Sequence, residues 1–173
     1  HSTVRALAFY LPQFHPVPEN DLWWGKGFTE WRNVTKARPK YEGHYQPHLP
    51  AALGYYDLRV PEAMGEQYQL ARRYGIEGFC VYRYDFSGRR IRAAPLDNLR
   101  TRPDIEFPFC VCWANENWTK HWDGGERALL LAQDYTDEHM RGVAADAARL
   151  ANDPRYIRVN DKPLFVVYRP FLI

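Results

Sequence analysis

The sequence predicts an α/β fold of the (β/α)₈ TIM-barrel type, with about the first four β/α units present in this chain. Short apolar runs alternate with helical patterns, which is typical of a parallel sheet covered by helices. Doubly wound sheets share this order, but no glycine-rich phosphate loop follows any apolar run here. A complete barrel needs about 250 residues and eight strands, and only four strands are expected in this chain. We therefore interpret residues 1–173 as the N-terminal part of a single barrel domain.

The expected strands are apolar runs that end at turn residues. The first stops before Pro12, because proline cannot donate to a sheet ladder, and the fourth follows a turn at residues 160–162. The four strands are expected at residues 4–10, 78–82, 107–113 and 164–168.

Helical patterns occupy the intervals after residue 60. The first expected helix has Pro61 in its first turn and ends at Gly75. A weaker pattern covers residues 89–100 and is interrupted near Pro95. The third helix is capped by Thr136, and its charged face, residues 141–149, is expected to face solvent. The expected buried positions are Met64, Tyr68, Ala71 and Tyr74 in the first helix and Met140, Val143, Ala144, Ala147 and Leu150 in the third.

A long segment, residues 12–56, separates the first strand from the first helix without clear periodicity. Loops of this length in compact domains are usually functional, and this one is rich in aromatic and hydrogen-bonding residues. Trp24 and Trp31 could contact a ligand, or they could anchor the loop by packing against its own side chains.

The composition excludes several classes of partner. The formal net charge is +2, and basic residues are scattered among acidic ones, so we expect no nucleic-acid partner. No apolar run approaches the roughly 18 residues of a membrane span. Three cysteines cannot all pair, and we expect buried reduced thiols, which fit a cytoplasmic setting, and no metal site. We also expect Cys110 and Cys112 to point to opposite faces of their strand. His15, His44 and His48 are too widely spaced to suggest metal ligands.

Residues 113–118, with the sequence WANENW, indicate a sugar-binding site. Pyranose rings are amphipathic, so their sites combine flat aromatic faces with amide or carboxylate groups. In a parallel barrel the site lies at the carboxyl ends of the strands, so the residues that follow each strand are candidates. The expected substrate-binding residues are Tyr10, Gln13, His15, Trp24, Glu30, Trp31, Tyr82, Tyr84, Trp113, Asn115, Glu116, Asn117, Trp118 and Arg169.

Glycoside hydrolysis requires two carboxyl groups about 5 to 10 Å apart. The chain offers Glu116 and Glu30 as weak catalytic candidates. Glu116, between two amides, is better placed to hold hydroxyl groups than to donate a proton. Glu30 could equally fasten the long loop, and Arg169 could form either a loop ion pair or a sugar contact.

At these residues the chain resembles the WbsX-like family, also described as glycoside hydrolase family 99-like domains of bacterial surface-polysaccharide biosynthesis proteins. The resemblance covers essentially the whole chain. Its matching stretches are residues 8–15 (AFYLPQFH), 19–21 (END), 24–31 (WGKGFTEW), 44–47 (HYQP), 53–58 (LGYYDL), 113–118 (WANENW) and 153–156 (DPRY).

The resemblance implies a (β/α)₈ barrel that acts on glycans, similar to retaining endo-α-mannosidases, by hydrolysis or by glycosyl transfer. It implies no cofactor, further domains in the same polypeptide, and catalytic carboxylates in the later half of the barrel, outside this chain. Two positions depart from the family pattern: Asp85 stands where a Trp is expected, and Ala93 and Ala94 stand where a Glu is expected before Pro95.

Two other functions stay open at this point. The chain could belong to a carbohydrate-recognition module without an acid/base pair. It could also be an inactive barrel fragment, because four strands leave two sheet edges unpaired.

Overall fold

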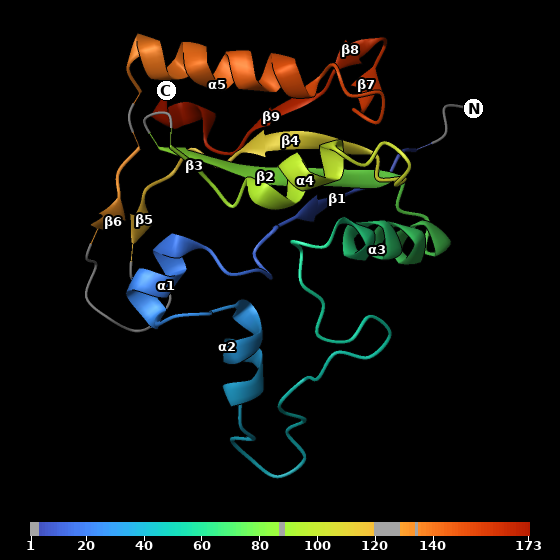
Figure 1. Cartoon of the computed structure of the whole chain (residues 1–173), viewed down its shortest axis with the longest axis vertical. Helices are drawn as coiled ribbons and strands as arrows, with labels where there is room; N and C mark the ends of the chain where they lie inside the picture. Colours follow the sequence, from blue (N-terminus) through green and yellow to red (C-terminus); the bar gives the residue numbers. More distant parts are fainter. Residues whose placement is uncertain (1–3, 87–88, 120–128, 134) are drawn as a thin grey trace.

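A parallel β-sheet forms the centre of the molecule (Figure 1). The computed structural model describes residues 4–86, 89–119, 129–133 and 135–173, with backbone alone at 89, 118–119 and 129–130. The sheet has the order β1 (Leu7–Tyr10), β2 (Gly78–Phe86), β4 (Phe109–Trp113) and β9 (Phe165–Val167), and all three pairings are parallel. The predicted parallel sheet and its four strands are therefore confirmed, although each strand except β2 is shorter than expected.

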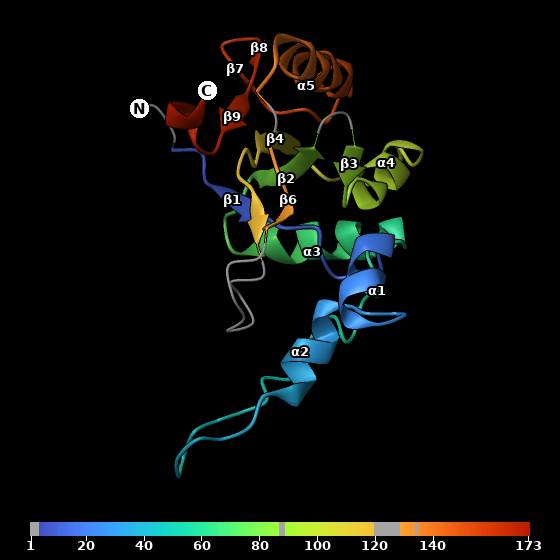
Figure 2. The same cartoon turned by 90° about the vertical axis from the view of Figure 1, so that its left-hand side faces the viewer.

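Three helices cover one face of this sheet. They are α3 (Pro61–Arg73), α4 (Ala94–Arg100) and α5 (Asp137–Leu150). Figure 2 shows all three arranged around the same side of the curved sheet. The face that they cover is called the helix face below, and the opposite side is called the open face.

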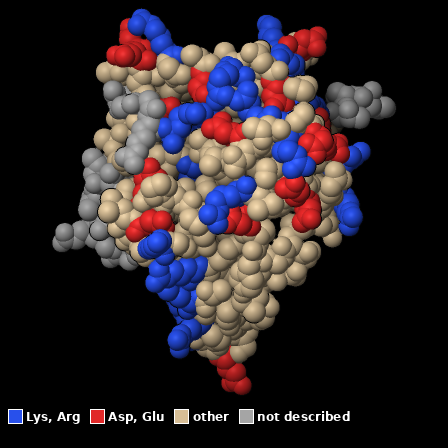
Figure 3. All heavy atoms as spheres, in the orientation of Figure 1, with Lys and Arg blue, Asp and Glu red and all other residues tan. Residues whose placement is uncertain are grey.

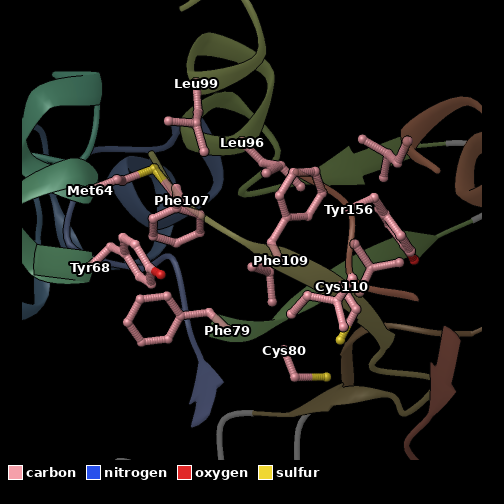
Figure 4. Close-up of a cluster of buried hydrophobic side chains, with 14 of the residues drawn as sticks. Met64, Tyr68, Phe79, Cys80, Leu96, Leu99, Phe107, Phe109, Cys110 and Tyr156 are labelled. Atoms are coloured by element: carbon pink, nitrogen blue, oxygen red, sulfur yellow. The ribbon is translucent and has the colours of Figure 1, made fainter. Parts of the chain in front are cut away.

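The hydrophobic core lies between the helix face and the helices (Figure 4). Phe79 and Phe107 stack with ring centres 5.0 Å apart, and Met64 of α3 and Leu99 of α4 are fully buried near them. Burial of each such side chain contributes about 2 kcal/mol to folding. The core therefore fixes the sheet on which the candidate site is built.

Strand alternation decides which side chains reach each face. Side chains alternate along β2, so Phe79 and Val81 face the helices while Cys80, Tyr82 and Tyr84 lie on the open face. Cys80 is opposite Cys110 across the β2–β4 pair. Residues two apart in a strand share a face, so Cys110 and Cys112 point to the same side, and the expectation of opposite faces is wrong. All three thiols are buried and free.

The long segment before α3 is not structureless, which corrects the sequence interpretation. It contains two short helices, α1 (Pro18–Trp24) and α2 (Glu30–Lys36). Each helix has seven residues, which is less than two full helical turns. Too few apolar positions recur over this length for periodicity to identify a helix. The local signals are Pro18 in the first turn of α1, Gly25 after its end, and Thr29 before α2.

The expected helix at residues 89–100 is wrong in its first part. Residues Arg89–Ile91 form β3, which pairs antiparallel with the end of β2. β2 extends to Phe86, beyond the predicted end, and so offers a partner edge for β3. The helix α4 begins only at Ala94, with Pro95 in its first turn, where proline is tolerated.

Three helix positions also differ from the expected burial. Tyr74 is the residue after α3 and is 81% exposed, and Ala144 of α5 is exposed. Asp146 lies on the expected solvent face of α5, but it forms an ion pair with Arg83, which projects from the helix face of β2. A nearly buried guanidinium requires a counter-charge, and Asp146 supplies it.

Two hairpins complete the structure. β5 (Trp118–Thr119) pairs with β6 (Leu129–Leu131), and β7 (Arg158–Val159) pairs with β8 (Lys162–Pro163). Asn160 and Asp161 make the second turn with positive φ angles of 49° and 62°, which confirms the predicted turn. The chain ends in a short 3₁₀ helix, Pro170–Leu172. Among the described residues no helix is both long and apolar enough to cross a membrane.

Gly78 is a sensitive point of the core. A Cβ atom there would lie 2.7 Å from the carbonyl oxygen of Pro108, which is fixed by a hydrogen bond from the Phe79 amide. We expect Gly78→Ala to lower the free energy of unfolding by about 2 kcal/mol in denaturant titrations. Gly142→Ala is the matched control, because a Cβ at Gly142 meets nothing within 4 Å and alanine should stabilise α5 by about 1 kcal/mol. Equal effects of the two substitutions would contradict the clash.

Candidate functional site

Polar side chains gather at the carboxyl ends of the parallel strands. Figure 1 shows that α1 and the β5–β6 hairpin lie beyond this edge of the sheet. A continuous series of contacts there forms what is called below the strand-end cluster. Its members are Gln13, Tyr82, Tyr84, Arg92, Glu116, Tyr168 and Arg169.

Glu116 and Arg169 form the charged part of the cluster. Their Oε2 and Nη2 atoms are 3.0 Å apart, and their side chains are 35% and 44% exposed. The guanidinium of Arg169 also lies 5.5 Å from the ring centre of Tyr168. An ion pair this exposed contributes at most about 1 kcal/mol to stability. Both groups can therefore exchange this contact for hydroxyl groups of a ligand at little cost.

Tyr82 and Tyr84 form the aromatic part of the cluster. Their ring centres are 6.5 Å apart, and Tyr82 also contacts Tyr168 edge-on at 5.9 Å. Burial raises the pKa of Tyr82, and burial with the nearby Glu116 raises the pKa of Tyr84 to about 12 against the opposing effect of Arg92. Both phenols therefore stay protonated at neutral pH and can donate hydrogen bonds to sugar oxygens.

Gln13 and Arg92 extend the cluster towards β1. Arg92 Nη1 donates to Gln13 Oε1 at 3.4 Å, and its guanidinium lies 5.7 Å from the ring centre of Tyr84. Burial lowers the pKa of Arg92, while Tyr84, Glu30 and Glu19 act in the opposite direction. Glu30 is thus electrostatically linked to the cluster, and it also accepts a hydrogen bond from Asn33 at 3.2 Å.

Asn115 fastens the loops of the site. Its Nδ2 donates to the carbonyl oxygen of Arg169 at 2.8 Å, and its Oδ1 accepts from the Arg169 amide at 2.7 Å. The side chain is completely buried. Both ends of the Asn115 amide are therefore engaged on the backbone of Arg169, and the residue positions Glu116 and Arg169.

Asn117 also holds a loop. Its Oδ1 accepts from the Gln133 amide at 2.7 Å, while the residue itself is exposed. Tyr135 adds a third connection, because its hydroxyl donates to the Asn115 carbonyl at 2.8 Å. The side chain of Trp118, another expected contact, lies outside the described part of the structure.

Two predicted site residues, Tyr10 and Trp113, lie on the helix face of the sheet. Tyr10 donates to Gln67 of α3 at 2.5 Å and packs against Phe79 in the core, and burial raises its pKa. Trp113 faces α5, where its ring lies 6.0 Å from that of His139. Neither residue reaches the strand-end cluster, because strand alternation places both on the helix face.

The two tryptophans of the long segment pack locally. Trp31 Nε1 donates to the carbonyl oxygen of Tyr56 at 2.9 Å, and its ring lies 4.4 Å from that of Phe14. Trp24 lies 6.0 Å from the ring of Phe28. These contacts match the anchoring interpretation that the sequence left open.

Sequence reasoning missed several residues near the cluster. Phe9, not Tyr10, stacks on Tyr82 at 5.4 Å, because Phe9 is in register with Cys80 on the open face. Arg92 was not considered because it lies in the expected helix. A positive φ of 56° at this non-glycine residue marks it in the structure but leaves no trace in the sequence.

The site residues do not suggest a metal. In the described parts of the chain, no three His, Cys, Asp or Glu side chains come together as possible ligands. The chemistry available is hydrogen bonding through phenols, an amide and a carboxylate, and stacking on aromatic rings.

His15 is buried beside the cluster. It is 1% exposed, and neither ring nitrogen has a hydrogen-bond partner among the described residues. Burial, assisted by Arg92 and opposed by Asp57, lowers its pKa to about 4. The ring is therefore neutral at pH 7 and still has both nitrogens available for water or a ligand.

We expect Asn115→Ala to lower the free energy of unfolding by about 2 kcal/mol, since it leaves the partly buried amide and carbonyl of Arg169 without these partners. Glu116→Gln, next to it in the chain, should change stability by less than about 1 kcal/mol. Denaturant titrations of both variants measure the difference. A mild effect of Asn115→Ala would show that the loop does not depend on this clamp.

Stability should fall in mild acid because of His15. The unfolded chain takes up a proton near pH 6.5, whereas folded His15 does so only near pH 4. Stability is therefore complete above pH 6.5 and is lost as the pH falls towards 4, by about 2 kcal/mol between pH 7 and pH 5. His15→Gln should flatten the pH dependence of unfolding in this range, and an unchanged slope would rule out His15 as its source.

Comparisons with known proteins agree with this architecture. Two structures of the GH99 endo-alpha-mannosidase from Bacteroides thetaiotaomicron, the first of them in complex with BIS-TRIS-propane, superpose with TM-scores of 0.58 and 0.57, respectively, at 15% identity. They cover 98% of this chain, which matches 43% and 46% of theirs. At this identity the likeness shows the fold alone.

Sequence comparison identifies the family. The protein WxcX of Xanthomonas campestris pv. campestris, in strains B100 and ATCC 33913, is 51% identical over 167 residues. This covers 96% of the chain but 24% of the relative, so the chain spans about a quarter of the length of these relatives. The family profile described as "Glycosyltransferase WbsX" matches residues 6–173. The chain therefore belongs to the WbsX glycosyltransferase family.

Proposed function

We propose that this chain is the N-terminal part of a (β/α)₈ barrel domain that acts on glycosidic bonds of a cell-surface polysaccharide, by hydrolysis or transfer. The strand-end cluster forms part of its sugar-binding site. Family membership supports glycan chemistry, and the fold of the endo-alpha-mannosidases supports a site at this edge of the sheet.

The observation that carries the proposal is the convergence of Tyr82, Tyr84, Glu116 and Arg169. Three different strands deliver these side chains to one edge of the sheet. Together they offer phenol donors, a carboxylate acceptor, a guanidinium and aromatic faces, which are the groups that bind a pyranose ring and its hydroxyls. Glu116 serves binding in this proposal, because its carboxylate already holds Arg169.

The remaining strands and the catalytic carboxylates would come from polypeptide outside this chain. Among the described residues, β1 pairs only with β2, and β9 pairs only with β4. Each outer strand thus has a free edge to which a further parallel strand can add. The relatives are about four times as long as the matched region, which leaves room for such units.

The experiment compares glycan binding and turnover by the full-length protein and its variants on an array of α-mannosides and bacterial surface polysaccharides. We expect Glu116→Gln and Tyr82→Ala each to weaken binding about tenfold or more, since each removes hydrogen bonds or stacking area.

Glu106→Gln is the matched control. Glu106 is also exposed and also pairs with an arginine at 3.0 Å, but it lies beside α3, away from the strand-end cluster. Binding retained in both cluster variants would refute the site. Binding without turnover, even in the unmodified protein, would support a carbohydrate-recognition module instead of an enzyme.

A further inference from the structure

The segment formed by residues 26–55, called the arm below, projects away from the sheet. It contains α2 and the chain that follows, and Figures 1 and 2 both show it extending beyond the rest of the molecule. Trp31 fixes its base, through the hydrogen bond to the Tyr56 carbonyl and ring contacts with Phe14 at 4.4 Å and Tyr56 at 5.1 Å. The contacts of Trp31 therefore hold the base of the arm in a defined position.

The arm carries more positive charge than the whole chain. Its five basic and two acidic residues give a net charge of +3, against +2 for the complete sequence, so the remainder has a net charge of −1. Figure 3 shows basic side chains gathered along one edge of the projection. The basic residues are Lys26, Arg32, Lys36, Arg38 and Lys40, and the acidic ones are Glu30 and Glu42.

These basic groups differ from those elsewhere in the molecule. Most arginines outside the arm form ion pairs, such as Arg5 with Glu77 and Arg72 with Glu106. Within the described residues, Lys36, Arg38 and Lys40 are exposed and form no ion pair. The description of the basic residues as scattered among acidic ones is therefore wrong for the arm. Uncompensated cations on one projection attract a polyanion.

Exposed aromatic rings lie next to these charges. Tyr41 and Tyr45 are 69% and 68% exposed. Each contacts a histidine three residues later: Tyr41 stacks on His44 at 4.5 Å with a 9° interplanar angle, and Tyr45 meets His48 edge-on at 4.7 Å. The histidines restrain the rings but leave them open to solvent. Restrained, accessible tyrosine faces suit the C–H faces of pyranose rings.

We propose that the arm is a second glycan-binding site, separate from the strand-end cluster, and that it takes a polysaccharide with carboxylate groups on its sugars. The proposal rests on the proposed function only in the choice of a glycan as the polyanion. The positive charge of the arm would attract the carboxylate groups of such a polysaccharide, and the exposed tyrosine rings would stack on its sugar rings. A second copy of the chain is a poor occupant, because two arms of charge +3 would repel each other.

Binding of polygalacturonate oligomers to the full-length protein tests this site. The matched probe is the carboxyl-reduced oligomer, which has the same ring without the charge. We expect the uronate to bind at least tenfold more tightly than the reduced form at low salt, with an affinity that falls as salt rises.

Two variants separate charge from stacking. Lys36→Gln/Arg38→Gln/Lys40→Gln should weaken uronate binding about tenfold or more and reduce its salt dependence. Tyr41→Ala/Tyr45→Ala should weaken uronate binding about tenfold and leave its salt dependence unchanged, because the rings supply stacking area and carry no charge. The control Arg73→Gln/Arg141→Gln/Lys162→Gln removes three exposed basic groups from other surfaces and should leave the affinity unchanged.

Several outcomes would overturn the proposal. One is no binding of uronate, and another is an equal loss of affinity in the control triple variant. A third is binding of a single-stranded oligonucleotide of equal charge at least as tightly as uronate, which would indicate nucleic acid. Glu116→Gln distinguishes the two sites, because it should weaken array binding at the strand-end cluster about tenfold or more and leave uronate binding by the arm intact. If the unmodified protein binds uronate but no glycan of the array, the proposed function is wrong and the proposal for the arm stands.

Discussion

The alternation of side chains along β2 is the constraint on which the molecule depends. β2 is central, with β1 and β4 paired in register on its two sides, so every second residue is committed to one face. Phe79 and Val81 enter the core under the helices, while Tyr82 and Tyr84 are left on the open face. A shift of one residue would exchange the two sets, and would place phenols in the core and a phenylalanine among the polar groups.

The site combines a rigid support with exchangeable contacts. Asn115 is buried and uses both ends of its amide on the backbone of Arg169, so it ties the loops after β4 and β9 together. Glu116 and Arg169, by contrast, hold each other through a partly exposed ion pair. A ligand can replace that ion pair without disturbing the clamp beneath it. Asn115 and Glu116 are adjacent in the sequence but have different roles, since Asn115 holds the loops and Glu116 offers an exchangeable contact. Their difference in burial accounts for this difference in role.

The sequence allows the sheet, its four strands and two of the main helices to be predicted, because apolar runs and helical repeats report burial directly. Register is not encoded so locally. Phe9 and Tyr10 are adjacent aromatic residues, and no local pattern says which one shares a face with Tyr82. Short helices such as α2 and the hairpin strand β3 depend on tertiary partners, so propensity could not identify them. Glu116 and Arg169 were candidates in the sequence because a parallel barrel places its site at the carboxyl ends of the strands.

The same alternation explains why the departure from the family pattern at Asp85 leaves the proposed sugar site intact. Asp85 follows Tyr84, so it points to the helix face, where its Oδ1 lies 3.5 Å from Nδ1 of His139 in α5. A larger aromatic side chain at this position would lie under α5 and not among the sugar-binding groups. Asp85 lines a pocket between the sheet and α5 together with Arg83 and Asp146, which pair with each other. Charged groups are costly to bury unless they are paired. Asp85, in place of the Trp expected in the family, therefore depends on its contact with His139 and contributes to the packing of α5 on the sheet. The departure therefore concerns how this helix is held, while Tyr82 and Tyr84 keep their place on the open face.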